Sequence, residues 1–126
     1  MRRWSRRSPT SSGYTKRALS QFVRVGDVAE VPPGTAKAFP LGMFEVAVFN
    51  IAGEFHALEN TCPHQGGPIA DGWLEGPIIT CPWHAWCFDV RSGKMTLGDF
   101  ARITRFAVKL QDGGIYVDPE PMPEAV

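Results

Sequence analysis

The sequence has little of several features that define other classes of protein. Only three cysteines occur among its 126 residues, and no apolar run approaches the roughly 18 residues of a membrane-spanning helix. Since three cysteines cannot form a disulfide framework, we expect a protein of a reducing, cytoplasmic compartment with no membrane span. No long stretch has the apolar periodicity of a helix, which favours a fold built from strands.

The charge is balanced overall but unevenly distributed along the chain. Thirteen basic and thirteen acidic residues give a net charge of zero. The first 17 residues hold six of the bases and no acid, so the rest of the chain has seven bases against thirteen acids. An acidic body argues against nucleic acid as the main partner and suits docking to a basic patch on another protein.

The N-terminal segment is rich in arginine and serine and lacks apolar periodicity. A secretory or twin-arginine signal needs an apolar stretch after the arginines, and none follows. A mitochondrial-type transit peptide fits the composition, although no amphipathic helix is evident. We expect residues 1–20 to form a disordered basic tail.

Short apolar segments bounded by turn residues fill most of the remaining chain. A single helical turn is expected at 28–30, after the N-cap residue Asp27. Residues 44–51 carry apolar side chains on both faces, as in a strand that is covered on both sides. The expected strands are residues 22–25, 35–39, 44–51, 54–58, 78–80, 86–90, 106–110 and 115–117.

These segments predict an all-β architecture with one inserted subdomain. The base domain is expected over residues 21–118, and a two-loop metal-binding subdomain over about 60–90 lies between its strands. Residues 119–126 are expected to form a C-terminal tail.

Two short segments each pair one cysteine with one histidine. They read Cys62-Pro63-His64 and, after sixteen further residues, Cys81-Pro82-Trp83-His84. Thiolate and imidazole ligands suit zinc, copper or iron–sulfur chemistry. Zinc sites usually group like ligands together, whereas two histidines replace two cysteines on one iron of certain [2Fe–2S] clusters.

The two motifs resemble those of the Rieske-type iron–sulfur proteins. The resemblance extends through GGPIADGWLEGPIITCPWHAWCFDVRSGK and, more weakly, over the strands from about residue 22 to 117. It implies a [2Fe–2S] cluster and an antiparallel β-sandwich or barrel base domain. By this resemblance Cys62 and Cys81 bind one iron, while His64 and His84 bind the outer iron and form the exit for electrons.

The residues around the ligands are expected to shape the cluster's surroundings. Glycines after the first pair would let backbone amides approach the sulfurs, and tryptophans would shield the cluster. Ala85 stands where the resembling loops usually have glycine. The expected surrounding residues are Gly66, Gly67, Pro68, Trp83, Ala85 and Trp86.

The resemblance also implies a low reduction potential. High-potential members carry one more cysteine in each loop, joined as a disulfide, at the positions of Gly67 and Trp83. Their hydroxyl hydrogen-bond donors fall at Trp86 and Phe88 here. With fewer hydrogen bonds to sulfur, the reduced cluster is less stabilised, so we predict a potential of about −150 mV, near the lower end of the Rieske range.

The remaining reactive side chains suggest no catalytic centre. His56 is expected to be an ordinary strand histidine and Cys87 a half-buried thiol, and Trp73 is expected to pack beside the cluster. Because the sequence offers no nucleophile, acid–base pair or second metal site, we expect an electron carrier without a catalytic site of its own.

Three functions are compatible with these expectations. The first is a Rieske ferredoxin that takes electrons from a flavin-dependent reductase and passes them to a terminal oxygenase. The second is the small Rieske subunit of an NADH-dependent nitrite reductase, which would dock on the large subunit. The third, from another class, is a structural Cys₂His₂ zinc module.

Overall fold

Two antiparallel sheets make up the computed structural model, which describes residues 21–63, 66–83, 86–98 and 101–122. The larger sheet has the strand order β1-β9-β8-β4-β3-β2, and the smaller has the order β5-β6-β7. The strands of the two sheets are β1 Val23–Asp27, β2 Thr35–Leu41, β3 Phe44–Ile51, β4 Glu54–Glu59, β5 Trp73–Glu75, β6 Ile78–Thr80, β7 Cys87–Asp89, β8 Arg105–Gln111 and β9 Gly114–Pro121. Two 3₁₀ turns, η3 (Val28–Glu30) and η4 (Ile69–Asp71), complete the described elements.

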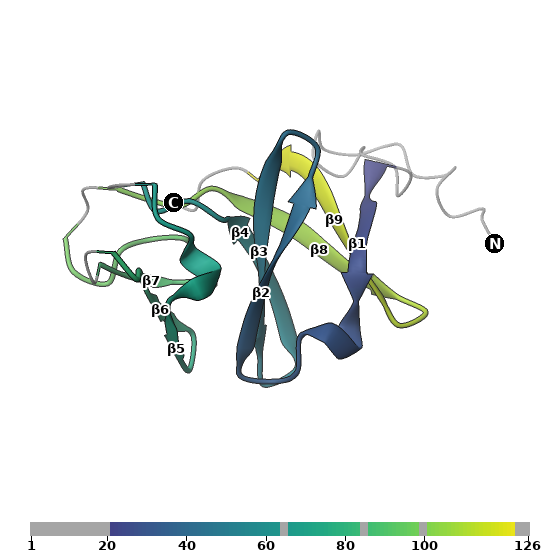
Figure 1. Ribbon diagram of the computed structural model, residues 1–126, viewed down its shortest axis with the longest axis horizontal. Coiled ribbons are helices and arrows are strands. Elements are labelled where there is room, and N and C mark those ends of the chain that lie inside the picture. Colours follow the sequence, from purple (N-terminus) through teal and green to yellow (C-terminus); the bar gives the residue numbers. More distant parts are fainter. Residues whose placement is uncertain (1–20, 64–65, 84–85, 99–100, 123–126) are drawn as a thin grey trace, which may run out of the picture.

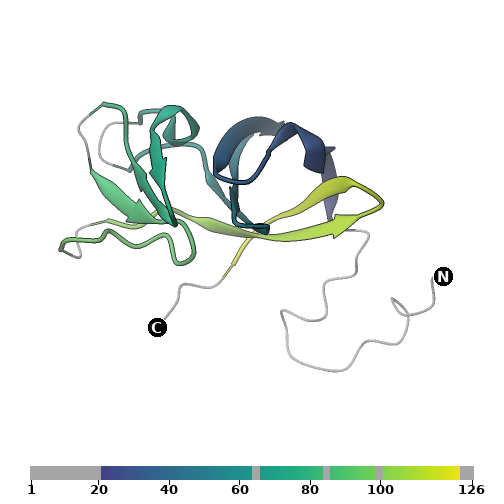
Figure 2. The same ribbon diagram turned by 90° about the horizontal axis from the view of Figure 1, so that it is seen from below.

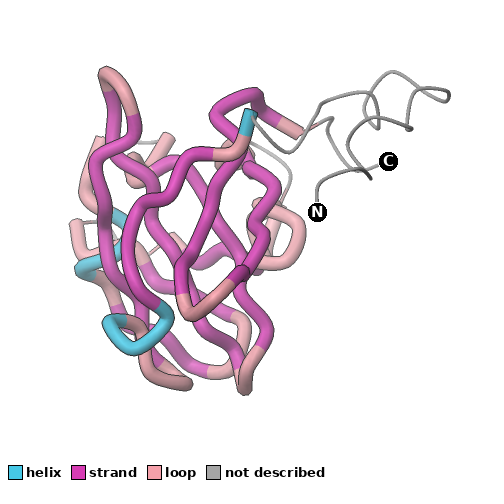
Figure 3. The backbone as a smooth tube through the Cα atoms, turned by 90° about the vertical axis from the view of Figure 1, so that its right-hand side faces the viewer, coloured by secondary structure: helices cyan, strands magenta, loops and turns pink. Residues whose placement is uncertain are grey.

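The larger sheet curls on itself to form the base domain (Figures 1 and 3). Its two edge strands approach each other closely, since a Cβ added to Gly26 of β1 would lie 2.5 Å from the ring of Phe39 in β2. The smaller sheet lies at one end of the base domain, with the loops of the inserted subdomain around it (Figure 2). The all-β fold with an inserted subdomain is therefore confirmed.

Strand β3 separates two buried cores. Val46 and Val48 face the core of the base domain, together with Ile115 and Val117 of β9. Their neighbours in sequence, such as Phe49, face a second core that is shared with the subdomain. This explains why β3 is apolar on both faces, as its sequence predicted.

Most expected strands are present within one or two residues, as is the helical turn after Asp27. That turn is closed by a bond from the Asp27 amide to a carboxylate oxygen of Glu30, 3.1 Å away.

Strand β5 and the turn η4 were not expected. Strand β9 continues to Pro121, three residues into the segment expected as a tail, and the chain is still bonded at Met122, whose amide donates to the Arg105 carbonyl at 2.8 Å. The expected tail of residues 1–20 lies outside the described residues.

None of the helices in the described part of the chain is long and apolar enough to cross a membrane.

Candidate metal centre

The two cysteine loops are closed by the same backbone hydrogen bond. The Cys62 amide donates to the carbonyl of Gly67 at 2.8 Å, and the Cys81 amide donates to the carbonyl of Trp86, also at 2.8 Å. In each loop the bond spans five residues, so each cysteine stands at the base of a turn of the same length. The sequence gives no sign of this equivalence, because the bonds join backbone atoms and not side chains.

Cys62 and Cys81 lie in the same buried core. Their exposed fractions are 1% and 0%, and both belong to the cluster that includes Ile79 and Phe88. No disulfide joins any of the three cysteines. Two thiols at equivalent loop positions, shielded by apolar side chains, match the donor chemistry that an iron–sulfur cluster requires.

The two expected histidine ligands, His64 and His84, lie outside the described residues, as does Ala85. Within the part of the chain that the structure describes, no group of three or more metal-ligating side chains comes together. The role of the histidines therefore stays a prediction.

Gly66 differs from its expected role. Its amide donates to the carbonyl of Cys62 at 2.7 Å, which makes a tight turn inside the first loop rather than a bond aimed at sulfur. Its φ of +80° lies in the left-handed region that favours glycine. The glycine is needed for the turn itself.

Trp83 of the second loop lies over Gly67 at the end of the first. A Cβ added to Gly67 would be only 2.9 Å from Cδ2 of the indole ring. Trp83 nevertheless remains 56% exposed, so its ring covers the other loop with one face and meets solvent elsewhere. Trp86 packs against the buried core, whereas Trp73 is 68% exposed. Shielding of the cluster by these tryptophans stays a prediction.

Asn60 is a buried polar residue whose role the sequence patterns did not reveal. Its side-chain amide donates to a carboxylate oxygen of Glu45 at 3.0 Å, and its side-chain oxygen accepts from the Ala70 amide at 2.7 Å. Asn60 therefore ties the end of β4, just before the first loop, to η4 just after it. Pro68 begins that turn, and its carbonyl accepts from the Asp71 amide at 3.1 Å. The sequence feature that could have pointed to Asn60 is its position, as a polar residue directly before Thr61 and Cys62.

The second loop is followed by a strand and an ion pair. Cys87 is half-buried, as expected, and its sulfur lies 3.3 Å from the hydroxyl of Thr80. At the end of β7, Asp89 accepts from the Arg91 guanidinium at 2.9 and 2.7 Å. These hydrogen bonds hold the pKa of Asp89 below its ordinary value and raise that of Arg91.

Comparisons with known proteins identify the family. The model that matches residues 21–106 is that of the Rieske [2Fe-2S] domain. Over 104 residues the chain is 35% identical to the biphenyl 2,3-dioxygenase ferredoxin component of Rhodococcus jostii RHA1, covering 82% of this chain and 94% of that protein. It is also 36% identical over 93 residues to apoptosis-inducing factor 3 of Homo sapiens, which covers 71% of this chain. The chain spans only 15% of that longer relative.

Solved structures give the same fold. A chain in the complex of reduced oxygenase and oxidised ferredoxin of carbazole 1,9a-dioxygenase aligns with a TM-score of 0.75 and 28% identity, covering 82% of this chain and 97% of that one. A protein described as the small subunit of a nitrite reductase aligns with a TM-score of 0.67, covering 76% and 96% of the two chains. At 15% identity, the latter likeness extends to the fold alone.

Proposed function

The chain belongs to the Rieske [2Fe-2S] domain family and carries a [2Fe–2S] cluster, and we propose that it passes single electrons from a flavin-dependent reductase to a terminal oxygenase. The observation that carries this proposal is the 35% identity to the biphenyl 2,3-dioxygenase ferredoxin component over 82% of this chain. Because the chain belongs to this family, an iron–sulfur cluster, and not a structural zinc ion, explains the two cysteine–histidine motifs.

The proposed ligands are Cys62 and Cys81 on one iron and His64 and His84 on the other. Two buried cysteines at equivalent positions of two loops support the first half of this assignment. The cluster supplies a one-electron redox couple when bound. The protein holds the two thiolates, keeps water from them with apolar neighbours, and covers the first loop with Trp83.

Docking to an oxygenase and a reductase is proposed at the end of the molecule that carries the two loops. The indole of Trp83 is exposed there, next in sequence to His84, and aromatic residues are common at the centres of interfaces. We propose the cytoplasm as the location, since the three cysteines form no disulfide.

A direct test is to supply the purified protein as the only carrier between the reductase and the oxygenase of the Rhodococcus jostii biphenyl system. We expect NADH-dependent reduction of the protein, followed by its reoxidation by the oxygenase in stopped-flow experiments. As a matched control, Cys81→Ala should be inactive while Cys87→Ala retains transfer. Failure of both steps, with an intact cluster, would contradict the proposal.

The alternative function is that of a nitrite reductase small subunit. Its support is the likeness in fold between this chain and one such subunit. The same purified protein distinguishes the two functions. Stable association with a nitrite reductase large subunit and stimulation of nitrite reduction, without transfer to the oxygenase, would favour the alternative.

A further inference from the structure

The side chain of Asn60 joins the two ends of the first cysteine loop. Asn60 stands two positions before Cys62 and is only 7% exposed. Its side-chain oxygen accepts a hydrogen bond from the Ala70 amide at 2.7 Å. Because Ala70 lies in η4, directly after the loop, this bond connects the segment that enters the loop to the segment that leaves it.

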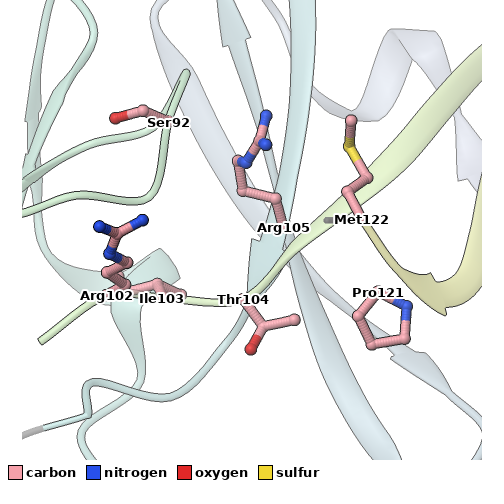
Figure 4. Close-up of a pocket in the computed structure, with 7 residues that line it drawn as sticks. All are labelled: Ser92, Arg102, Ile103, Thr104, Arg105, Pro121 and Met122. Atoms are coloured by element: carbon pink, nitrogen blue, oxygen red, sulfur yellow. The ribbon is translucent and has the colours of Figure 1, made fainter. Parts of the chain in front are cut away.

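The entering segment is itself fixed to the base domain. The Glu59 amide donates to the Thr104 carbonyl, and the Asn60 amide donates to the Glu45 carbonyl, each at 2.9 Å. Figure 4 shows Thr104 on the segment that runs into Arg105 at the start of β8, with the two side chains on opposite sides of the chain. The side-chain amide of Asn60 adds a bond to the Glu45 carboxylate at 3.0 Å. Asn60 therefore holds η4 against a segment that the base domain already fixes.

The second cysteine loop is held at its ends in a different way. Strands β6 and β7 flank it and pair at Thr80 with Cys87 and at Ile79 with Phe88, so a backbone ladder joins the two ends. In the part of the chain that the structure describes, no ladder joins the ends of the first loop, because β4 pairs with β3 and β8 instead. The hydrogen bond between Asn60 and η4 takes the place of that ladder.

The turn η4 also contacts the start of the second loop. Gly72, which follows it, packs so closely on the Thr80 carbonyl that a Cβ on Gly72 would overlap the oxygen. Thr80 is the neighbour of Cys81 in sequence. Ile69, the first residue of η4, is fully buried in the core that contains both Cys62 and Cys81. A shift of η4 would therefore change the position of one buried cysteine relative to the other.

We propose that Asn60 is a positioning residue for the cluster, and that its side chain fixes η4 and thereby the spacing of Cys62 and Cys81. This inference rests on the proposed binding of the cluster by these two cysteines, but not on the identity of the redox partner. Burial disfavours the more negatively charged, reduced state of a cluster. Loss of the Asn60 bonds admits water to the two thiolates and should therefore raise the midpoint potential.

The first test compares two buried asparagines of β3 and the first loop in the full-length, cluster-loaded protein. Asn50, near the far end of β3, is the matched control and is 3% exposed. Its side-chain amide donates to the Val31 carbonyl and its side-chain oxygen accepts from the Gly53 amide, each at 2.8 Å. The two asparagines thus make the same kinds of bond, but those of Asn50 lie within the base domain.

Asn60→Ala should favour reduction about threefold, which is about 28 mV for a one-electron couple. It should also release the cluster to a chelator about tenfold faster, because loss of a buried hydrogen bond promotes local opening. Asn50→Ala should lower the unfolding free energy but leave the midpoint potential unchanged. Redox titration and the decay of visible absorption make the comparison.

A charge-balanced pair of substitutions tests the hydrogen bonds themselves, and it carries the test if Asn60→Ala does not retain a cluster. Asn60→Asp keeps an acceptor for the Ala70 amide but sets two carboxylates against each other at Glu45, so at pH 8 it should speed cluster loss. Adding Glu45→Gln restores a donor and an acceptor with the original net charge. The double variant should release its cluster within about twofold of the rate of the unaltered protein.

Three results would overturn the proposal. One is an unchanged or lowered midpoint potential in Asn60→Ala, and another is cluster loss in Asn60→Ala that is no faster than in Asn50→Ala. The third is a double variant that loses its cluster as fast as Asn60→Asp alone. An error in the ligand assignment would give a different result, because Cys62→Ala would then retain its iron.

Discussion

The indole ring of Trp83 rests on the α-carbon of Gly67. A methyl group added to Gly67 would lie 2.9 Å from Cδ2 and 3.0 Å from Cγ of the ring, which are atoms near its root and not at its movable end. These are the two positions at which high-potential Rieske proteins are expected to carry the cysteines of a disulfide. In this chain, the contact between the Trp83 ring and Gly67 joins the two loops at these positions instead.

This contact predicts that Gly67→Ala destabilises the protein. The methyl group must displace the indole, and overpacking of this kind typically costs about 1–3 kcal/mol of unfolding free energy. Chemical denaturation measures that loss, and the rate at which visible absorption decays in the presence of a chelator measures the effect on the cluster.

Trp83→Ala provides the matched control for this prediction. Without the indole there is nothing for the methyl group to displace, so adding Gly67→Ala to Trp83→Ala should cost little further stability. If the losses of unfolding free energy from the two substitutions were additive in this double-mutant cycle, the Trp83 ring would not be the group that the added methyl displaces.

Cysteine replacements should separate ligands from the third thiol. Cys62→Ala and Cys81→Ala should each abolish bound iron and acid-labile sulfide, because in the proposed assignment each loop supplies one buried thiolate to the cluster. Cys87→Ala should retain both at the level of the unaltered protein, since Cys87 is held near Thr80 in a strand outside the loops. Iron and sulfide analysis per chain makes the comparison. Loss of the cluster in Cys87→Ala alone would mean that the ligands are misassigned.

The ion pair at the end of β7 predicts a pH-dependent contribution to stability. Asp89 has a lowered pKa in the folded protein because it accepts hydrogen bonds from Arg91. The ionised form therefore stabilises the fold above the ordinary carboxyl pKa, and this stabilisation is lost as the pH falls through the lowered value. Asp89→Asn should reduce the unfolding free energy by about 0.5–1 kcal/mol near neutral pH.

The pH profile distinguishes this ion pair from a general effect of the substitution. Denaturation curves of Asp89→Asn and the unaltered protein should converge in acid, once the pH has fallen through the lowered pKa of Asp89. Asp112→Asn is the matched control, because Asp112 sits in an exposed turn with a φ of 51° that asparagine also tolerates. A deficit in Asp89→Asn that is independent of pH would contradict the role of Asp89.

Sequence patterns predicted the features that depend on neighbouring residues. Apolar side chains on both faces located β3, and one cysteine with one histidine in each loop indicated the cluster. Strand β5 was missed because Trp73, Leu74 and Glu75 form a segment too short to show alternation, and only pairing with β6 makes it a strand.

Features that depend on contacts between distant residues could not be predicted. The Trp83 indole reaches Gly67 across sixteen positions in the chain, and Asn60 joins Glu45 to Ala70. Nothing in residue spacing encodes either contact. The same holds for the amide bonds that close the two loops. These contacts arise only when the sheets are assembled.

Redox titration of the purified protein tests the central claim most directly. We predict that a single one-electron couple accompanies the visible spectrum, with a midpoint of about −150 mV, at the low end of the Rieske range. This value follows from loops that have Gly67 and Trp83 in place of a disulfide and Trp86 and Phe88 in place of hydroxyl donors. A clearly positive midpoint would contradict the low-potential assignment, and a colourless protein that binds zinc without any redox couple would contradict the cluster itself.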